Sequence, residues 1–489
     1  MKKTFLSLLL LLAATAASAQ PRPKLIVGIA VDQMRWDYLY RFYDEYGNDG
    51  FKRMLNEGYT FENCQINYIP SVTAIGHTSI YTGSVPSIHG IAGNNFIVDG
   101  QYVYCCTDTL VQTVGSGTKN GQRSPIRLLT TTIGDELKTA TDWKSRVVGV
   151  SFKDRAAILP AGQSADAAYW FDAEAKCFVT STYYRNELPK WAADYNAKID
   201  TSRDIADIQY DPYGNLIVEE MAKCAIQGEQ LGQRGQTDML CVSFSCPDIT
   251  GHRYGTHHEK THAQYVELDK QLADFFAFLD KKIGKGQWLA FLTADHGAAN
   301  GILQNQAYKI KAGGFFIDKE EPALNEYLKQ RFGAAHLSER IMDNKVVLDR
   351  ETIARAGLSL DSVKAAVMEY YGNHEAVQYV ADLEKATQAV MPTYIREKMI
   401  NGYNRERSGD IQLILKTGWY GVWENIDGGT SHTQWNPFDC HIPFVLLGWG
   451  VHHGAYNHEV HITDIAPTVC SIVHLQMPSG CIGQGVYEE

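Results

Sequence analysis

Short apolar runs that end at a polar residue recur along the chain. The runs at 25–31 (LIVGIAV), 147–152 (VVGVSF), 239–245 (MLCVSFS) and 288–293 (WLAFLT) are continuous rather than alternating. Continuous runs of this length are typical of strands buried on both faces, as in a parallel sheet covered by helices. Another run, at 442–447 (IPFVLL), lies near the end of the chain. This pattern predicts an α/β fold with a central, mostly parallel sheet flanked by helices.

The residues that follow these runs carry much of the candidate chemistry. In chain order they are Asp32, then Lys153 and Arg155, then Asp248, and finally Asp295 with His296. Ligands of open α/β sheets bind outside the carboxyl ends of the strands. A single strand that ends in Asp could reflect turn chemistry alone. Several such runs together predict one shared site at that edge of the sheet.

The first residues of the chain follow a different pattern. Lys2 and Lys3 precede a mostly apolar run over 5–14, and a small-x-small pattern ends at Ala19. This combination predicts a signal peptide over 1–19 that is cleaved during export, and hence a periplasmic or secreted protein. A membrane anchor is the alternative, but the run is shorter than the roughly 20 residues that span a bilayer. No later stretch is long and apolar enough to span one, so no stable membrane insertion is expected.

Composition narrows the class of protein further. Hydrophobic residues make up 45% of the chain and charged residues 21%, which is ordinary for a globular protein. Removal of the two lysines in the signal segment moves the formal net charge from −11 to −13. An acidic chain is a poor candidate for nucleic-acid binding, which requires a basic face. No feature of the sequence indicates an obligate protein partner.

Cysteine usage fits export without defining a motif. The chain has ten cysteines, an even number, and Cys105 and Cys106 are adjacent. In an oxidising compartment we expect two to five disulfides beside some buried thiols. No pair shows the C-x-x-C spacing of a structural zinc site.

Two long segments interrupt the series of apolar runs. Residues 156–237 contain Pro, Tyr and Trp in irregular order, and we expect them to form a substrate-side insertion. Residues 300–430 contain helical and strand-like stretches and are expected to form an inserted subdomain that caps the edge of the sheet. We therefore predict one catalytic domain over 20–489 that carries both insertions.

Candidate metal ligands are distributed along the whole chain. Asp248 and His252 are four residues apart, about one helical turn, so both side chains can face one ion. Each motif is weak when taken alone. The complete set consists of Asp32, Asp248, His252, Asp295, His296 and His432, the last in a glycine-rich loop. Three carboxylates and three imidazoles suit two divalent ions, and nitrogen with oxygen ligands favours Zn²⁺.

A nucleophile is predicted within residues 68–89. A helix that begins near Thr73 would place this hydroxyl at the N-terminal end, where free amides and the helix dipole favour an oxyanion. The alternative role for Thr73 is a helix N-cap. Ser71, Thr78 and Thr82 are local rivals for the role of nucleophile.

The order of these residues resembles the alkaline phosphatase superfamily. The resemblance rests on Asp32, Thr73, Asp248 with His252, Asp295 with His296, and His432. It implies an alkaline phosphatase-like fold with two Zn²⁺ ions. One ion would be bound by Asp248, His252 and His432, and the other by Asp32, Asp295 and His296. Thr73 would bridge toward the second ion and form a covalent phosphothreonine.

Two branches of this superfamily use a threonine nucleophile. One is the nucleotide pyrophosphatase/phosphodiesterase group, which cleaves diesters. The other is the phosphate-irrepressible alkaline phosphatase group of Bacteroidetes-type bacteria, which cleaves monoesters. Lys153 and Arg155 resemble the Lys-x-Arg pair of the monoesterase branch, although a solvated loop pair is the alternative. Asn94 resembles an asparagine that both branches share, with Asn95 as an alternative register.

The resemblance implies a phosphate monoester hydrolase with a broad range of small-molecule phosphate esters. Its first alternative is a phosphodiesterase of the nucleotide pyrophosphatase type. The second is a metal-stabilised binding protein without activity, which is disfavoured because no ligand position is vacant.

Overall fold

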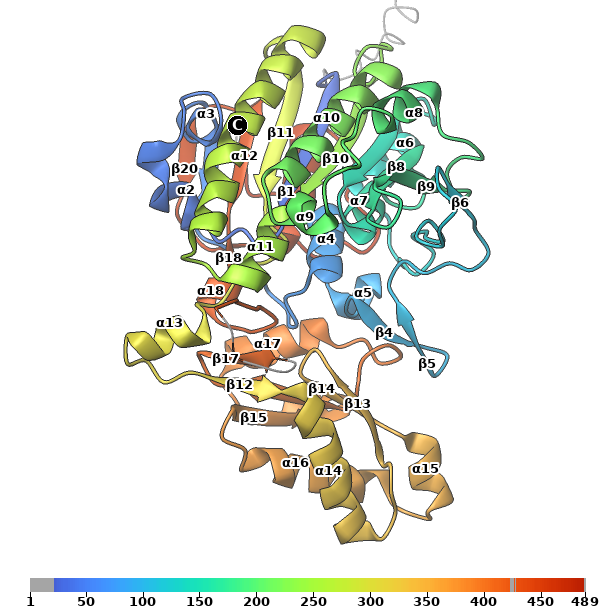
Figure 1. The fold of residues 1–489 in the computed structure, drawn as a ribbon, viewed down its shortest axis with the longest axis vertical. Helices are drawn as coiled ribbons and strands as arrows, with labels where there is room; N and C mark the ends of the chain where they lie inside the picture. The colour runs from blue at the N-terminus through green and yellow to red at the C-terminus, as the bar shows by residue number, and fades with distance from the viewer. Residues whose placement is uncertain (1–21, 423–425, 427, 488–489) are drawn as a thin grey trace, which may run out of the picture.

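The computed structural model describes residues 22–422, 426 and 428–487, so the predicted signal peptide lies outside the described residues. Its centre is a ten-stranded sheet (Figure 1). The strands lie in the order β20 (Gly454–Tyr456), β2 (Tyr59–Phe61), β19 (Phe444–Gly448), β11 (Trp288–Thr293), β1 (Leu25–Val31), β10 (Asp238–Phe244), β7 (Val147–Ser151), β8 (Ala167–Asp172), β9 (Cys177–Ser181) and β6 (Thr113–Val114).

The middle of this sheet is parallel, as the continuous apolar runs predict. Strands β11, β1, β10, β7 and β8 all run in the same direction. Strand β1 pairs with β10 from Leu25 opposite Asp238 to Val31 opposite Phe244. All of its residues are buried. Strands β19 and β9 run antiparallel to their inner neighbours. The predicted α/β fold with a mostly parallel central sheet is confirmed.

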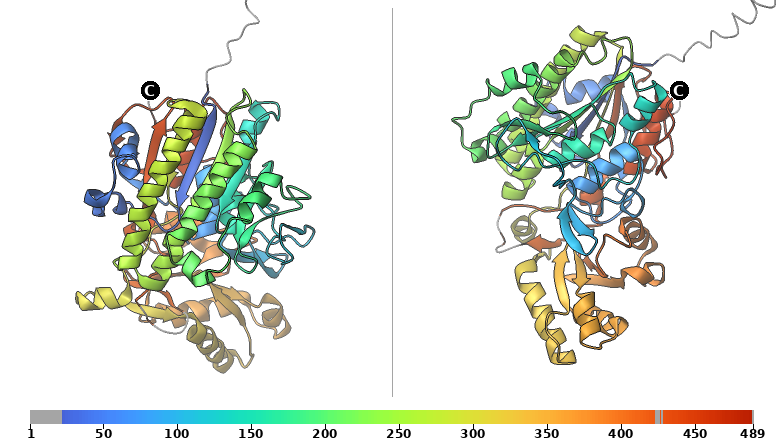
Figure 2. Two further views of the ribbon diagram at one scale, coloured as in Figure 1. Left: turned by 45° about the horizontal axis from the view of Figure 1, so that its top comes forward. Right: turned by 90° about the vertical axis from the view of Figure 1, so that its right-hand side faces the viewer.

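Helices cover both faces of the sheet, which explains why its inner strands are apolar throughout (Figure 2). One layer contains α3 (Phe51–Glu57), α8 (Lys190–Asn196), α10 (Tyr213–Gly228) and α12 (Glu259–Leu279). The other contains α4 (Thr73–Thr82), α6 (Ile133–Ala140), α7 (Asp154–Ala161) and α19 (Ile465–Ile472). The shorter helices outside these layers are α2 (Tyr38–Arg41), α5 (Pro86–His89), α9 (Ile205–Gln209), α11 (Cys246–Tyr254), α13 (Ile302–Ala307) and α18 (Pro437–Cys440).

A second lobe lies below the sheet in Figure 1. Its four-stranded sheet has the order β13 (Ser338–Met342), β14 (Lys345–Leu348), β16 (Ile411–Leu415) and β15 (Val377–Asp382). The lobe also contains α14 (Ile317–Phe332), α15 (Arg350–Arg355), α16 (Leu360–Gly372), α17 (Thr393–Gly402) and the strand pair β12 (Gly313–Phe316) and β17 (Trp419–Val422). It has an apolar core of its own, which includes Phe315, Leu328 and Leu413.

Two small sheets complete the fold near the junction of the two lobes. One consists of β18 (His441–Ile442), β3 (Cys64–Gln65) and β21 (Val460–His461). The other is a hairpin of β4 (Asn95–Val98) and β5 (Gln101–Tyr104). This hairpin begins directly after Asn94.

The structure changes the expectation for residues 156–237. This segment supplies β8 and β9 to the ten-stranded sheet and α10 to its helical cover, so it is part of the central body rather than an insertion. The polar and aromatic residues around these elements had obscured their periodicity. Residues 300–430 contain all elements of the second lobe, while its exact boundaries stay a prediction.

The expectation of disulfides also differs from the structure. None of the ten cysteines, all of which lie in the described residues, is disulfide-bonded. A chain of this length buries enough apolar surface to fold without such cross-links. Among the described residues, no helix is both long and apolar enough to cross a membrane.

Candidate active site

The carboxyl ends of the parallel strands bring the predicted carboxylates and imidazoles together. Two groups could each hold a metal ion, and the ligand atoms within each group lie within 4.8 Å of one another. The first group is Asp248, His296 and His432, and the second is Asp32, Asp295 and His296. His296 therefore belongs to both groups. Asp32, Asp248 and Asp295 with His296 meet here because β1, β10 and β11 are neighbours in the sheet, whereas His432 comes from a loop between β17 and α18.

His252 lies beside the first group. Its Nε2 is 3.2 Å from Asp248 Oδ1, and its side chain is 41% exposed. Both residues are on α11, Asp248 in the first turn and His252 in the last. The structure thus brings His252 to the same carboxylate as His432, whose Nε2 is 3.9 Å from Asp248 Oδ1.

The second group contains buried ligand atoms that have no hydrogen bond among the described residues. Asp32 Oδ1, Asp295 Oδ2 and His296 Nε2 are buried and make no hydrogen bond within the described part of the chain. All three residues are 0% exposed. The neighbours of these atoms are one another and His77: both His77 Nδ1, at 3.3 Å, and His296 Nε2, at 3.4 Å, face Asp295 Oδ2. Buried charges are costly unless they are paired or bound to a metal. The donor set of carboxylates and imidazole fits Zn²⁺.

The three histidines are held in the orientation that metal binding requires. The Nδ1 atoms of His252, His296 and His432 lie 2.9, 3.0 and 2.6 Å from the backbone oxygens of Thr430, Gly297 and Ser71. A proton on Nδ1 that is donated to a carbonyl leaves Nε2 free as a ligand. In each case Nε2 is the atom that faces the carboxylates.

The pKa values of the carboxylates depend on the charged groups around them. Burial, together with the neighbouring charges of Asp248 and Asp295, raises the pKa of Asp32 well above its usual value. Burial also acts to raise the pKa of Asp248, but nearby His252 and Lys153 hold that pKa well below its usual range. A carboxylate cluster of this kind is favourable only when cations compensate it.

Helix α4 presents Thr73 at its first residue. The N-cap position is occupied by Val72 and makes no side-chain cap, so Thr73 is not an N-cap. Thr73 is 1% exposed. The predicted helix start near Thr73 is confirmed, and this end of the helix favours a negative charge.

The rival hydroxyls are all committed to backbone carbonyls. Thr78 Oγ1 donates to Ala74 O at 2.7 Å, and Thr82 Oγ1 donates to Thr78 O at 2.8 Å. Ser71 Oγ donates to the backbone oxygen of Gln434 at 3.3 Å. Their geometry therefore favours Thr73 as the reactive hydroxyl.

Asn94 lies beside the same helix start. Its side-chain Oδ1 accepts a hydrogen bond from the backbone N–H of Ala74 at 2.9 Å. This contact orients the Asn94 amide, so its NH₂ group remains available as a donor next to Thr73. Asn95 instead begins β4, where it pairs with Tyr104.

Lys153 and Arg155 lie at the beginning of α7. Lys153 Nζ bridges the two metal-ligand groups, at 2.6 Å from Asp32 Oδ2 and 2.5 Å from Asp248 Oδ2. Arg155 donates from Nη1 to the hydroxyl of Tyr104 at 3.2 Å, and its buried Nε makes no hydrogen bond within the described chain. The pair is thus partly buried against other groups and is not a solvated loop pair.

Three further residues at the site have no counterpart in the sequence predictions. Gln33 donates from Nε2 to Asp248 Oδ1 at 2.6 Å. His77, one helical turn after Thr73, has Nδ1 2.9 Å from Thr73 O. Tyr104 contacts Arg155. The only sequence signals were that Gln33 follows Asp32 and that His77 is four residues after Thr73.

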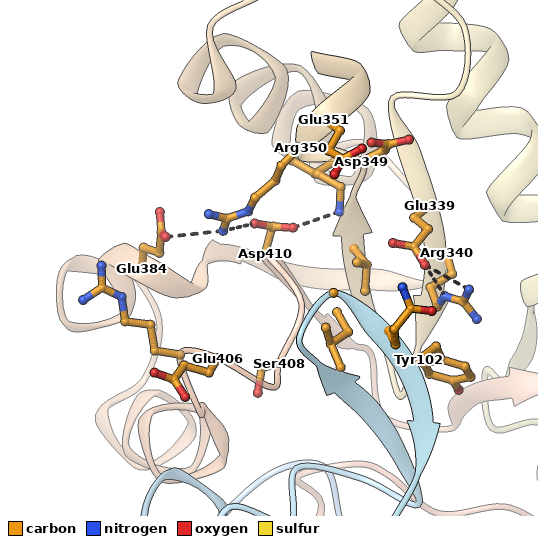
Figure 3. Close-up of a pocket in the computed structure, with 16 residues that line it drawn as sticks. Tyr102, Glu339, Arg340, Asp349, Arg350, Glu351, Glu384, Glu406, Ser408 and Asp410 are labelled. Atoms are coloured by element: carbon orange, nitrogen blue, oxygen red, sulfur yellow. Dashed lines mark hydrogen bonds and ion pairs between the residues drawn. The ribbon is translucent and has the colours of Figure 1, made fainter. Parts of the chain in front are cut away.

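An open pocket of about 840 Å³ lies elsewhere, between the tip of the β4–β5 hairpin and the second lobe (Figure 3). None of the predicted site residues lines it. Two of its arginines form ion pairs: Arg350 pairs with Asp410 at 2.5 Å, and Arg340 pairs with Glu339 at 2.9 Å. The predicted site residues lie at the sheet edge and not in this pocket.

Known proteins resemble the chain over nearly its whole length. A family model described as type I phosphodiesterase / nucleotide pyrophosphatase matches residues 26–435. Alkaline phosphatase PafA of Elizabethkingia meningoseptica is 43% identical, covering 98% of this chain and 96% of its own. Alkaline phosphatase PhoV of Synechococcus elongatus is 42% identical, covering 95% and 92%. A Myroides odoratus protein named calcium-transporting ATPase is also 42% identical, covering 97% and 96%.

A solved structure gives the same result. The crystal structure of wild-type PafA matches with a TM-score of 0.93 at 43% identity, covering 96% of this chain and 99% of that chain.

Proposed function

The chain belongs to the type I phosphodiesterase/nucleotide pyrophosphatase family of the alkaline phosphatase superfamily, and on this premise we propose that it is an alkaline phosphatase, a hydrolase of phosphate monoesters. Two relatives at 42–43% identity are named alkaline phosphatases. The observation that carries the proposal is the position of Lys153 and Arg155, two cations at the start of one helix beside the carboxylate cluster.

Alkaline phosphatases generally use metal ions, and we infer two Zn²⁺ ions here. Asp248, His252 and His432 would hold one, and Asp32, Asp295 and His296 the other. The proximity of His296 to both carboxylate groups supports a closely spaced pair of ions. When bound, such ions stabilise negative charge on a transferred phosphoryl group and lower the pKa of a coordinated hydroxyl.

The protein groups around Thr73 then define the reaction. Thr73 attacks the phosphorus atom, the bond to the ester oxygen breaks, and the alcohol leaves. Water next attacks the phosphothreonine, which releases inorganic phosphate and restores the hydroxyl. Asn94 would donate from its amide to a non-bridging oxygen, because its Oδ1 is already fixed by Ala74 N–H.

Lys153 and Arg155 would favour monoesters over diesters. A monoester carries one more charged oxygen than a diester, and charge-assisted contacts to phosphate are among the stronger hydrogen bonds. The Nε atom of Arg155 is buried without a partner, so a donor remains for an anionic ligand. A diester would replace the charged oxygen by an alkyl group and lose part of this stabilisation.

The test compares rates on phenyl phosphate and on the matched diester methyl phenyl phosphate. We expect the monoester to react much faster in the wild-type protein. Removing an oxyanion-type donor costs about 3 kcal/mol, a factor of roughly 10²–10³ in rate. Lys153→Ala with Arg155→Ala should therefore reduce monoester cleavage by at least about 10², while diester cleavage falls much less. Equal losses on both substrates would move the phosphodiesterase alternative to first place.

We further infer that the mature protein is periplasmic or secreted and acts on a broad range of small phosphate esters. N-terminal sequencing of the exported protein should give Gln20 as the first residue. An intact Met1 on active, exported protein would contradict the predicted cleavage.

A further inference from the structure

Gln33 has an unusual backbone conformation for a buried residue. Its φ angle is 65°, in the left-handed region, although its side chain is only 3% exposed. This conformation costs a non-glycine residue about 1–2 kcal/mol. Such strain persists only where the surroundings hold the residue in place, and it is concentrated at functional sites.

The strained conformation lets Gln33 contact both metal-ligand groups at once. Its backbone N–H donates to Asp295 Oδ1 at 3.1 Å. Its side-chain Nε2 donates to Asp248 Oδ1 at 2.6 Å. Asp295 belongs to one group of ligands and Asp248 to the other. One residue therefore spans the two groups, by two chemically separate contacts.

Helix α11 has a glycine where the side chain of Gln33 packs against it. Gly251 lies on α11 between Asp248 and His252, and a Cβ atom at this position would be 2.0 Å from Gln33 Oε1. Any larger residue would displace the amide. The amide is thus confined between Asp248 on one side and the backbone of α11 on the other, which fixes the orientation of the Asp248 carboxylate.

We propose that Gln33 is a positioning residue whose side chain orients Asp248 for metal binding, whereas its backbone N–H orients Asp295. The proposal rests on the proposed function, in which both groups hold an ion. Outer partners of ligating carboxylates typically contribute 10–100-fold in metal affinity. The side chain should therefore affect the ion bound by Asp248, while the other ion depends on a backbone contact that side-chain substitution leaves in place.

Gln33→Gly separates these contributions. Glycine adopts the left-handed conformation without strain, which offsets the loss of the side-chain hydrogen bond to Asp248, so the Tm of the metal-free protein should change little. The N–H contact with Asp295 should remain, but the affinity for one of the two ions should fall by about 10–100-fold. Competition with a graded series of chelators, followed by elemental analysis of the protein, measures each ion separately. Gln33→Met, of similar length without the amide, should lose the same ion.

Gln230 provides a matched control. It is an exposed glutamine that also has a left-handed φ, of 54°. Gln230→Gly removes the same kind of strain away from the site, so it should leave the affinity for both ions unchanged.

Gly251→Ala tests the same contact from the other side. It should weaken the same ion as Gln33→Gly by displacing the amide from Asp248. In the double variant with Gln33→Gly, the added methyl group meets no amide, so it should have little further effect. Additive losses in the double variant would show that Gly251 acts independently of Gln33.

The outcomes distinguish this inference from the proposed function. A wild-type protein that binds fewer than two ions contradicts the proposed function. Two ions in the wild type with unchanged affinities in Gln33→Gly and Gln33→Met would overturn the role of Gln33 alone. Loss of both ions together with a lower Tm of the metal-free protein would show a general structural role instead.

Discussion

Thr73 is the first residue of α4, whereas the hydroxyls of Thr78 and Thr82 on the same helix are bound to backbone carbonyls. We predict that Thr73→Ala folds normally and loses monoester turnover by several orders of magnitude, since the covalent step is removed. Thr73→Ser should keep a substantial part of the activity. Acid quenching during turnover should trap a phosphothreonine in the wild-type protein only.

Thr78→Ala is the matched control for this experiment. It removes a buried threonine hydroxyl from the same helix, whose bond to Ala74 O contributes about 1 kcal/mol. Its turnover should stay close to that of the wild type. If Thr73→Ala retains most activity, or Thr78→Ala loses as much, Thr73 is not the nucleophile.

At the scale of elements, the β4–β5 hairpin connects two parts of the site. It follows Asn94 and ends at Tyr104, whose hydroxyl accepts from Arg155 and donates to Asp154. Tyr104→Phe should leave the guanidinium of Arg155 less well oriented. We expect kcat/KM for a phosphate monoester to fall about 10-fold, the equivalent of about 1.4 kcal/mol, with a smaller effect on a diester.

Tyr102 on the same hairpin is the control for Tyr104. Tyr102 is 40% exposed, and its ring centroid lies 4.0 Å from the guanidinium carbon of Arg340 instead of contacting Arg155. Tyr102→Phe should leave both rates unchanged. A similar loss in the two variants would mean that the hairpin acts through its stability and not through Arg155.

Helix α4 must lie very close to the loop after β11. A Cβ at Gly76 would be 2.2 Å from the backbone oxygen of Asp295, a contact that cannot be tolerated without movement. Alanine normally stabilises a helix by about 1 kcal/mol relative to glycine. We predict the reverse for Gly76→Ala: a lower Tm in thermal unfolding, and weaker metal binding because Asp295 shifts.

Gly372, at the end of α16, is the matched helical glycine. A Cβ there meets nothing within 4 Å. Gly372→Ala should be neutral or stabilising by up to about 1 kcal/mol. Equal Tm changes in the two variants would show that close packing at Gly76 is not the cause.

At the scale of the whole molecule, the turn between β13 and β14 joins the second lobe to the catalytic loops. Asn344 donates from Nδ2 to Thr433 Oγ1 at 3.2 Å, next to His432. Lys345 donates from Nζ to Ala92 O at 3.3 Å, two residues before Asn94. The lobe thus supports two segments that carry site residues.

Because Lys345 is buried, the free energy of unfolding should depend on pH in a testable way. Burial lowers its pKa from 10.5 to about 8, against the opposing charge of Asp343. Below pH 8, Lys345 is charged in both states, and the cost of burying the charge is present in full. Between pH 8 and 10.5 the unfolded chain binds more protons than the folded chain, so this contribution to stability rises with pH.

Between pH 8 and pH 10 the expected gain is about 2 kcal/mol, because the full slope of about 1.4 kcal/mol for each pH unit holds only between the two pKa values. Denaturant unfolding at pH 8 and pH 10 should show it as a difference between the wild type and Lys345→Met, in which the gain is absent. Lys311→Met, an exposed lysine of the same lobe, should retain the wild-type dependence. Identical pH profiles for wild type and Lys345→Met would contradict the prediction.

The sequence by itself determined the central strands and the chemical types of the site residues. Strand periodicity and burial are local properties, so runs such as 25–31 and 288–293 identified the parallel sheet directly. The polar residues after these runs were predictable as one site because strand ends of a parallel sheet meet at one edge. The start of α4 at Thr73 followed from the same local signals.

The tertiary structure alone decided how those residues are combined. Gln33 contacts Asp248, 215 positions away in the chain, and the hydroxyl of Tyr104 reaches Arg155 across 51. Such contacts depend on the order and register of strands, which local patterns do not encode. The same reason explains why 156–237 looked like an insertion: the pairing of β8 with β7 is a long-range choice, made by packing against the whole sheet.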